Sequence, residues 1–183
     1  MGHAHPVPLP ARLVRTARLT LAPPGRENLP DLIRLKGDPR VFELMLHGVR
    51  TVEMARAELE DDMAFWAQRG YGTWCVFHTE SGEFLGISGL MERPDGRGIA
   101  LRFALWPECR GHGYAREAAK AGLEFGHRAG LARIIAVAWE QNHPSRHVLT
   151  DIGMTECDAF DYRGRHMIVY ESCQTGSAQP PPR

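Results

Sequence analysis

The sequence predicts one α/β domain built around a mixed, mostly antiparallel sheet, and three observations carry this prediction. Short apolar segments between residues 72 and 105 are separated by the turn signals Ser81-Gly82 and Pro94-Asp95-Gly96, which is typical of an antiparallel meander. Residues 113–127 follow a helical pattern, and residues 134–139 form a continuous apolar run that is typical of a strand buried on both faces. This order predicts a strand–helix–strand crossover directly after the meander.

The segments before the meander predict one strand and several helices. Residues 18–22 alternate as a strand that ends at a pair of prolines. Residues 28–36 have the spacing of a short amphipathic helix, and a second helical piece is expected over residues 41–45. Thr51 is the expected N-cap of a longer helix that extends to Gly70.

The remaining elements follow in the same way. The meander strands are expected over residues 72–78, 83–90 and 99–105. Residues 144–152 predict a helix after the buried strand. A final hairpin is expected from strands over residues 157–162 and 166–171.

The chain ends differ in composition from the segment between them. Residues 1–11 are rich in Pro and His and are expected to form a flexible leader, and residues 175–183 are expected to form a disordered tail. Residues 12–174 contain neither an internal repeat nor a linker, so we expect a single domain there.

Charge and cysteine usage exclude several classes of protein. The 22 basic residues balance the 22 acidic ones, which argues against a protein that coats nucleic acid or an anionic membrane. The four cysteines have no CxxC spacing, so neither a zinc site nor a disulfide framework is expected, and no metal is predicted. The chain shows no signal peptide and no transmembrane run, and a cytoplasmic location is the expectation.

The stretch that carries chemistry runs from Leu105 to Glu117. A strand is expected to end at Pro107, and a loop with two glycines leads straight into a helix. Backbone N–H groups at a helix start lack partners and favour anions, so such a loop predicts a phosphate cradle. Gly111 and Gly113 allow close approach of the backbone, and Arg110 adds a positive charge. The alternative interpretation is a glycine-rich turn without a ligand.

Two motifs at this point resemble a known family. Arg110-x-x-Gly113-x-Ala115 resembles the pyrophosphate-binding motif of the GNAT superfamily of acetyl-CoA-dependent N-acetyltransferases. Asn142-His143-Pro144-Ser145, followed by Ile152-Gly153-Met154, resembles the Asn-x-x-Ser…Leu-Gly-Phe stretch of that family. The Leu-x-Leu start, Asp38-Pro39, Trp74, Gly86 and Gly89 are similar to the branch of the ribosomal-protein N-terminal acetyltransferases (RimJ/RimL-like).

The resemblance implies a GNAT-like acyl-CoA N-acyltransferase fold whose sheet has a V-shaped splay and is flanked by helices. It implies that acetyl-CoA (CoA) is the co-substrate. Its pyrophosphate would lie on the loop, and its pantetheine arm would run beside one strand in an added-strand manner. The Leu105 N–H would polarise the thioester carbonyl as an oxyanion donor. The implied cofactor-binding residues are Phe103, Leu105, Trp106, Arg110, Gly111, His112, Gly113, Tyr114, Ala115, Asn142 and Ser145.

The catalytic residues are less well defined by the resemblance. Many members place a Tyr where this chain has Leu149, so the usual acid is missing, and Ser145 or a water held by Asn142 is the substitute. Glu140, at the end of the buried strand, is the nearest carboxylate for a general base, and a solvated strand-end charge is the alternative interpretation. Glu92 and His112 are weaker candidates, and direct attack by the amine with little side-chain help stays open.

The function implied is transfer of an acetyl group from acetyl-CoA to a primary amine by direct attack in a ternary complex. The acceptor is a protein N-terminus or a small amine, such as a polyamine, an amino acid or an antibiotic amine. The acidic run Glu58, Glu60, Asp61 and Asp62 hints at a polyamine or an aminoglycoside, but a solvated helix face explains it more simply. The alternative function is a non-catalytic acyl-CoA-binding or regulatory protein on the same fold. A homodimer is compatible with the sequence.

Overall fold

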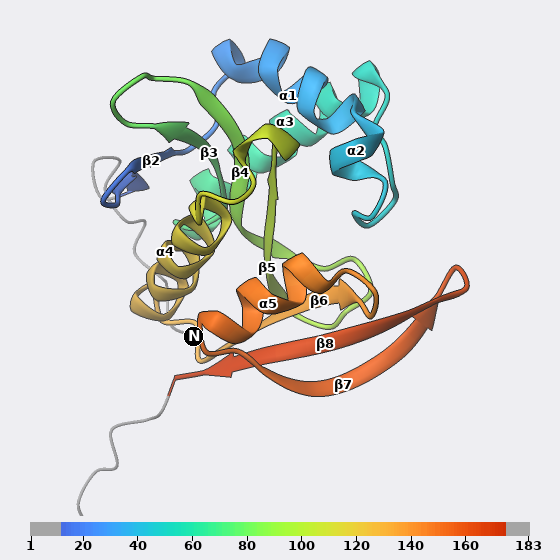
Figure 1. The fold of residues 1–183 in the computed structure, drawn as a ribbon. Helices are drawn as coiled ribbons and strands as arrows, with labels where there is room; N and C mark the ends of the chain where they lie inside the picture. Colours follow the sequence, from blue (N-terminus) through green and yellow to red (C-terminus); the bar gives the residue numbers. More distant parts are fainter. Residues whose placement is uncertain (1–11, 175–183) are drawn as a thin grey trace, which may run out of the picture.

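The computed structural model describes residues 12–174, which form one eight-stranded sheet with helices on both of its faces (Figure 1). The strand order is β1-β2-β3-β4-β5-β6-β8-β7. The predicted leader and tail, residues 1–11 and 175–183, lie outside the described residues. The fold class predicted from the sequence is confirmed.

The elements have the following bounds. The strands are Val14–Arg15 (β1), Leu19–Ala22 (β2), Thr73–His78 (β3), Phe84–Glu92 (β4), Ile99–Leu105 (β5), Arg133–Trp139 (β6), Thr155–Tyr162 (β7) and Arg165–Cys173 (β8). The α-helices are Leu29–Gly37 (α1), Pro39–Phe42 (α2), Val52–Arg69 (α3), Tyr114–Arg128 (α4) and His143–Asp151 (α5). Two 3-10 turns, Arg26–Asn28 (η2) and Pro107–Cys109 (η3), precede α1 and follow β5.

The junction between β5 and β6 is the feature that positions the site. Neighbours from β1 to β5 pair antiparallel, as do β6, β8 and β7, whereas β5 and β6 run parallel. Within residues 12–174 their register consists of the single pair Ala100 and Ile135. The two strands therefore separate toward their carboxyl ends, which is the predicted V-shaped splay.

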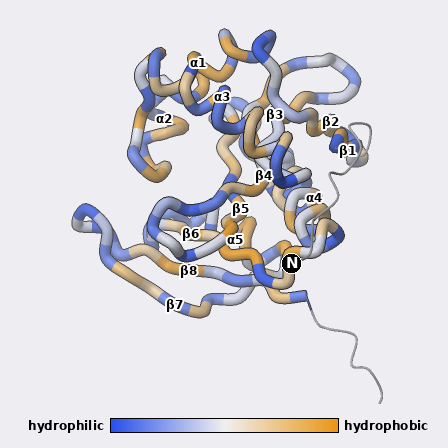
Figure 2. The backbone as a smooth tube through the Cα atoms, turned by 180° about the vertical axis from the view of Figure 1, so that it is seen from behind, coloured by the Kyte–Doolittle hydropathy of each residue, from blue (hydrophilic) through white to orange (hydrophobic). Residues whose placement is uncertain are grey.

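Two apolar clusters hold the sheet between its helices. One joins α4 to β2–β5 through residues such as Trp74, Leu101 and Phe125, and the other joins α1 and α3 to Ile87 and Ala104. Trp74 and Phe125 meet edge-to-face at 4.9 Å between ring centroids. Figure 2 shows hydrophilic residues at the tip of the β7–β8 hairpin, which extends beyond the rest of the sheet in Figure 1.

Local signals account for most helix ends. The Thr51 side chain accepts a hydrogen bond from the Met54 N–H, and Gly70 adopts a left-handed conformation (φ 74°), so α3 begins and ends as expected. The helical piece expected over residues 41–45 was wrong in extent, because α2 ends at Phe42. His47 and Gly48 both have positive φ values, 69° and 70°, and a series of turns replaces the helix there.

No helix formed by residues 12–174 has the length and apolar character needed to cross a membrane. The strand β1, which has two residues, was not expected from the sequence.

We predict that Gly86→Ala lowers the free energy of unfolding by about 2–4 kcal/mol. A Cβ there would lie 2.2 Å from the Ala104 carbonyl oxygen on β5, and φ is 149°, so the substitution adds both a clash with backbone and strain. Urea unfolding measures the change.

The matched control is Gly37→Ala, where the nearest atom to a new Cβ is the Arg50 oxygen at 3.7 Å. We expect the control to change stability by less than about 1 kcal/mol. Equal stability of the two variants would contradict the close approach of β4 and β5.

Candidate active site

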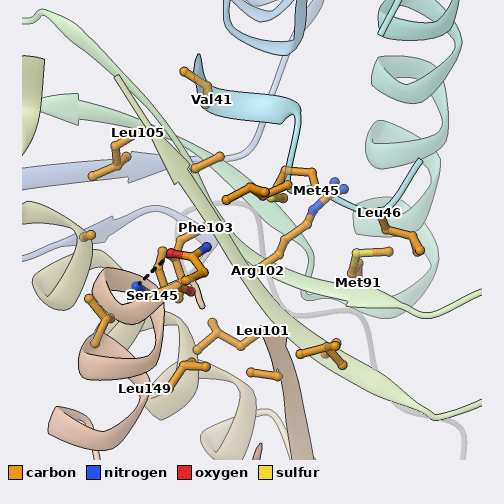
Figure 3. A pocket seen from close by; sticks show the side chains of 18 of the residues that line it. Val41, Met45, Leu46, Met91, Leu101, Arg102, Phe103, Leu105, Ser145 and Leu149 are labelled. Atoms are coloured by element: carbon orange, nitrogen blue, oxygen red, sulfur yellow. Dashed lines mark hydrogen bonds between the residues drawn. The ribbon is translucent and has the colours of Figure 1, made fainter. Parts of the chain in front are cut away.

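One continuous cleft of about 1130 Å³ opens where β5 and β6 separate (Figure 3). Its walls come from both faces of the sheet. On one side lie β5, the loop before α4, and α5; on the other lie the segment around α2, α3, and the β7–β8 hairpin. Of the residues predicted to bind the cofactor, the cleft is lined by Phe103, Leu105, Trp106, Arg110, Gly111, Gly113, Tyr114, Ala115, Asn142 and Ser145.

The loop between η3 and α4 has the backbone geometry of an anion cradle. Gly111 and Gly113 have φ values of 81° and 77°, a region that favours glycine, and Gly113 is the N-cap of α4. Gly113 gives the first turn no side-chain acceptor, and the Glu117 N–H donates to the Gly113 carbonyl at 3.0 Å. The N–H groups between these two residues precede the helical ladder and can serve a phosphate.

A partly exposed ion pair between Arg18 and Glu117 anchors this loop to the first strands. The Glu117 carboxylate accepts hydrogen bonds from the Thr16 hydroxyl at 2.6 Å and from the Arg18 N–H at 2.8 Å. Arg18 also pairs with Glu117 through its guanidinium at 2.8 Å and donates to the His112 carbonyl at 2.7 Å. Burial acts to raise the pKa of Glu117, but the hydrogen bonds from Thr16 and Arg18 outweigh it, so the pKa is lowered. The carboxylate therefore stays charged and anchors the loop to the first strands.

The same loop is packed by aromatic rings. The Arg18 guanidinium lies 4.6 Å from the centre of the Tyr114 ring, and His112 stacks on Tyr114 at 5.4 Å. His112 itself is exposed and does not line the cleft. Arg116 does line it, and no sequence motif had indicated this residue.

The backbone edge of β5 is open toward β6. The Trp106 N–H donates to the Leu85 carbonyl at 2.9 Å, and Leu105 pairs with Gly86. Because N–H groups alternate along an antiparallel strand, those of Leu105 and Phe103 face away from β4 and toward the gap. The parallel partner has already diverged there, so these donors are available to an extended ligand.

The start of α5 supplies the second predicted motif. The Asn142 side chain accepts a hydrogen bond from the Ser145 N–H at 3.4 Å, and Pro144 occupies the first turn. Figure 3 shows Ser145 beside Phe103 within the cleft, so α5 and β5 face each other across it. Leu149 is buried and lines the same wall.

Glu140 lies at a different place from the other predicted residues. It is exposed at the end of β6 and does not line the cleft, and its N–H donates to the His166 carbonyl at 2.9 Å. Its role as a general base stays a prediction. The carboxylates that line the cleft on the side of α3 are Glu58, Asp61, Asp62 and Glu92.

A charged network on that side was not foreseen. The Lys36 side chain is fully buried, and its Nζ lies 2.7 Å from Glu58 and 3.8 Å from Asp62. Arg50 also pairs with Glu58, and Arg102 pairs with Asp62 at 3.2 Å. Burial alone would raise the pKa of Glu58. The combined effect of Lys36 and Arg50 is larger and opposite, so the pKa of Glu58 is below its ordinary value. Glu58 and Asp62 of the acidic run are thus paired with cations and do not belong to a solvated helix face.

The thiols do not add a nucleophile to this cleft. Cys109 lines it, but burial, with smaller contributions from Glu83 and Glu108, raises the pKa of its thiol. Burial raises the pKa of Cys75 to about 12. Within the described residues, no group of three or more His, Cys, Asp or Glu side chains is placed to hold a metal ion.

Comparison with known families settles the class of the protein. Residues 18–155, most of the chain, match the family described as acetyltransferase (GNAT) domain. The chain belongs to the GNAT acetyltransferase family. The fold is thus that of a GNAT acetyltransferase domain.

The relatives of this chain include a transacetylase and an acetyltransferase of known structure. The FsC-acetyl coenzyme A-N(2)-transacetylase of Aspergillus fumigatus is 28% identical over 158 residues, which are 80% of this chain and 66% of that relative. The chain therefore spans 66% of the length of the curated relative. An acetyltransferase structure from Agrobacterium tumefaciens is 27% identical with a TM-score of 0.76, over 88% of this chain and 94% of that one.

Ribosomal-protein acetyltransferases are also among the structural neighbours. A RimL ribosomal alpha-N-protein acetyltransferase, solved in complex with coenzyme A, is 18% identical with a TM-score of 0.72, over 88% of this chain and 98% of that one. A ribosomal-protein alanine acetyltransferase from Vibrio fischeri is 15% identical with a TM-score of 0.74, over 90% of this chain and 97% of that one. At such identities the likeness concerns the fold alone.

We predict that Gly113→Val reduces binding of CoA below detection by isothermal titration while the fold is retained. A β-branched residue does not tolerate a φ of 77°, so the loop must change shape and its N–H groups must turn away. Circular dichroism and the thermal midpoint measure retention of the fold.

Gly130→Val is the matched control, because Gly130 also has a positive φ, 96°, but lies after α4 and away from the cleft. The control should bind CoA like the unchanged protein. Unaltered CoA affinity in Gly113→Val would contradict the prediction that this loop binds the pyrophosphate of CoA.

Proposed function

We propose that this protein transfers an acetyl group from acetyl-CoA to a primary amine by direct attack in a ternary complex. The observation that carries the proposal is the continuity of the cleft. One cavity joins the loop before α4 to the chamber beneath α2 and α3, and it passes the open edge of β5. A thioester held at that edge and an amine beneath α2 and α3 could therefore meet within one continuous cleft.

The residues present fit the cofactor. When bound, acetyl-CoA supplies the activated acetyl thioester. The N–H groups of residues 111–116, with Arg110 and Arg116, are suited to its phosphates. The Phe103 and Leu105 N–H groups are suited to amide and thioester carbonyls, and a donor in this position stabilises developing negative charge on a carbonyl oxygen. Asn142 and Ser145 face the same strand from α5.

Proton transfer requires a base for the ammonium of the acceptor and a donor for the thiolate that leaves. Ser145 is our proposed donor because its side chain belongs to the cleft wall and Leu149 offers no proton. Glu140 remains our proposed base, reached through water, since it does not line the cleft. Glu92 lines the cleft, but it pairs with Arg69 at 3.0 Å.

The acceptor is a protein N-terminus or a small amine. The names of the neighbours point both ways, since some act on ribosomal proteins and one relative is an N(2)-transacetylase. We also propose a cytoplasmic location, because the four cysteines are all free, as in reducing compartments.

A non-catalytic acyl-CoA-binding protein is the second candidate. One observation favours it: Leu149 is buried where many family members place a Tyr. Such a protein would bind acetyl-CoA without turnover.

We expect isothermal titration with acetyl-CoA, and separately with CoA, to give micromolar dissociation constants, about −8 kcal/mol. Thiol release in the presence of an amine panel then separates the two candidates, because an enzyme releases CoA only as amine is acetylated. Binding without release for every amine would leave the non-catalytic function. No binding of either compound would refute both candidates.

We predict that Glu140→Gln lowers kcat by at least about tenfold and removes the acidic limb of the pH profile of kcat/KM. The amide cannot accept the proton, whereas the shape of the side chain is kept. Glu124→Gln is the control, since Glu124 is an exposed carboxylate on α4 that pairs weakly with Lys120 at 4.0 Å. A rate and a pH profile equal to those of the control would show that Glu140 is a solvated surface charge and not the general base.

A further inference from the structure

We propose that the acceptor is a small amine that also carries a carboxylate, of the amino-acid class with an apolar side chain, and that Arg102 and Arg50 hold this carboxylate. The inference rests on the proposed acetyl transfer and names the substrate class of the same cleft. It starts from the charge network beneath α2 and α3, which no sequence motif had indicated.

The network carries more positive than negative charge. Its members are three cations, Lys36, Arg50 and Arg102, and two carboxylates, Glu58 and Asp62. The Lys36 side chain is 0% exposed, that of Arg50 is 5% exposed and that of Arg102 is 13% exposed. Charges removed from water need partners, and this set lacks one anion.

The arginines also retain hydrogen-bonding capacity. Arg102 donates from Nε to the Thr73 hydroxyl at 3.1 Å and from Nη2 to Asp62. Arg50 donates from Nε to Glu58 and from Nη1 to the Gly48 carbonyl. Within residues 12–174, Nη1 of Arg102 and Nη2 of Arg50 have no acceptor, and both residues line the cleft. A guanidinium is suited to binding a carboxylate at such a position.

Most other charged groups on this side already have partners. Arg40 pairs with Asp38 at 2.7 Å, Arg93 with Asp95 at 2.6 Å, and Glu92 with Arg69 at 3.0 Å. Asp61 lines the cleft without an ion pair among the described residues, but it is exposed, so water screens its charge. It does not supply the anion that the network lacks.

Apolar side chains line the cleft beside the charged network. Figure 3 shows Arg102 extending from β5 toward Met45 and Leu46, with Met91 close by. Leu44 also lines the cleft and is 38% exposed, and Phe160 closes the far wall. Phe160 is held there by the Arg97 guanidinium, 3.9 Å from its ring centre. An acceptor with an apolar side chain would cover this surface while its carboxylate meets the arginines.

The experiment compares leucine with leucinamide as acceptors by thiol release, because the two share the apolar side chain and only leucine carries a carboxylate; concentrations are expressed as free amine, since the amide also lowers the pKa of the amine. We expect kcat/KM of the unchanged protein to be roughly tenfold or more higher for leucine. In Arg102→Gln this preference should be lost: the value for leucine falls by about that factor, and the value for leucinamide changes by less than about threefold. Arg102→Lys keeps the positive charge but lacks the paired N–H donors of a guanidinium, so it should give an intermediate preference.

Arg56→Gln is the matched control, because Arg56 lies exposed on α3 and does not line the cleft. It should keep the preference for leucine. If Arg102→Gln fails to fold, Arg102→Lys and Arg50→Lys provide the same comparison. Circular dichroism and titration with acetyl-CoA establish that each variant is folded and binds the co-substrate.

Three results would overturn the inference. Leucinamide could be acetylated as fast as leucine, Arg102→Gln could slow both compounds equally, or only amines without a carboxylate could be acetylated. All three leave the proposed acetyl transfer intact. Absence of acetyl-CoA binding by the unchanged protein is different, because it would remove the proposed function itself.

Discussion

The separation of β5 from β6 is the constraint on which the rest of the structure depends. A parallel pair that stayed in register would consume the backbone donors of both strands, whereas here the pairing ends at Ala100 and Ile135. This one pair joins the two halves of the sheet, and β4 pairs with β5 and β8 with β6 on their outer sides. Each strand is thus fully supported by its antiparallel neighbour, which leaves the inner edges open for a ligand at little cost in stability.

Two ion-paired assemblies hold opposite ends of the cleft. Arg18 and Glu117 fasten the loop before α4 to the first strands, so the glycines of that loop keep their positive φ values. The network around Lys36 joins α1, α3 and β5 at the other end. Both assemblies connect elements that are distant in sequence, so they fix the shape of the cavity rather than any one helix. Preorganised polar groups of this kind reduce the ordering that binding would otherwise require.

The sequence predicted the fold and the cofactor end better than the acceptor end, for physical reasons. Period-two alternation, glycine turns and an N-cap such as Thr51 are local signals, and they placed nearly every element. The loop around Gly113 could be found because its function needs glycine at fixed spacing. Arg18 and Glu117, 99 residues apart, carry no local signal for each other. The extent of α2 was misjudged because apolar residues beyond Phe42 face the cleft instead of continuing a helix.

The four carboxylates of the acidic run on α3 do not share one environment. Residues 58 and 62 are four apart and therefore share one helix face, whereas residue 60 points elsewhere. Glu60 pairs with Arg26 on the exposed side, and Glu58 and Asp62 turn inward to Lys36. The sequence favoured a solvated helix face for all four carboxylates, with an acidic cleft for a polyamine or an aminoglycoside as the alternative. Because the cations that pair with them come from α1, β5 and the α2–α3 connection, only the assembled structure reveals that these two carboxylates are paired.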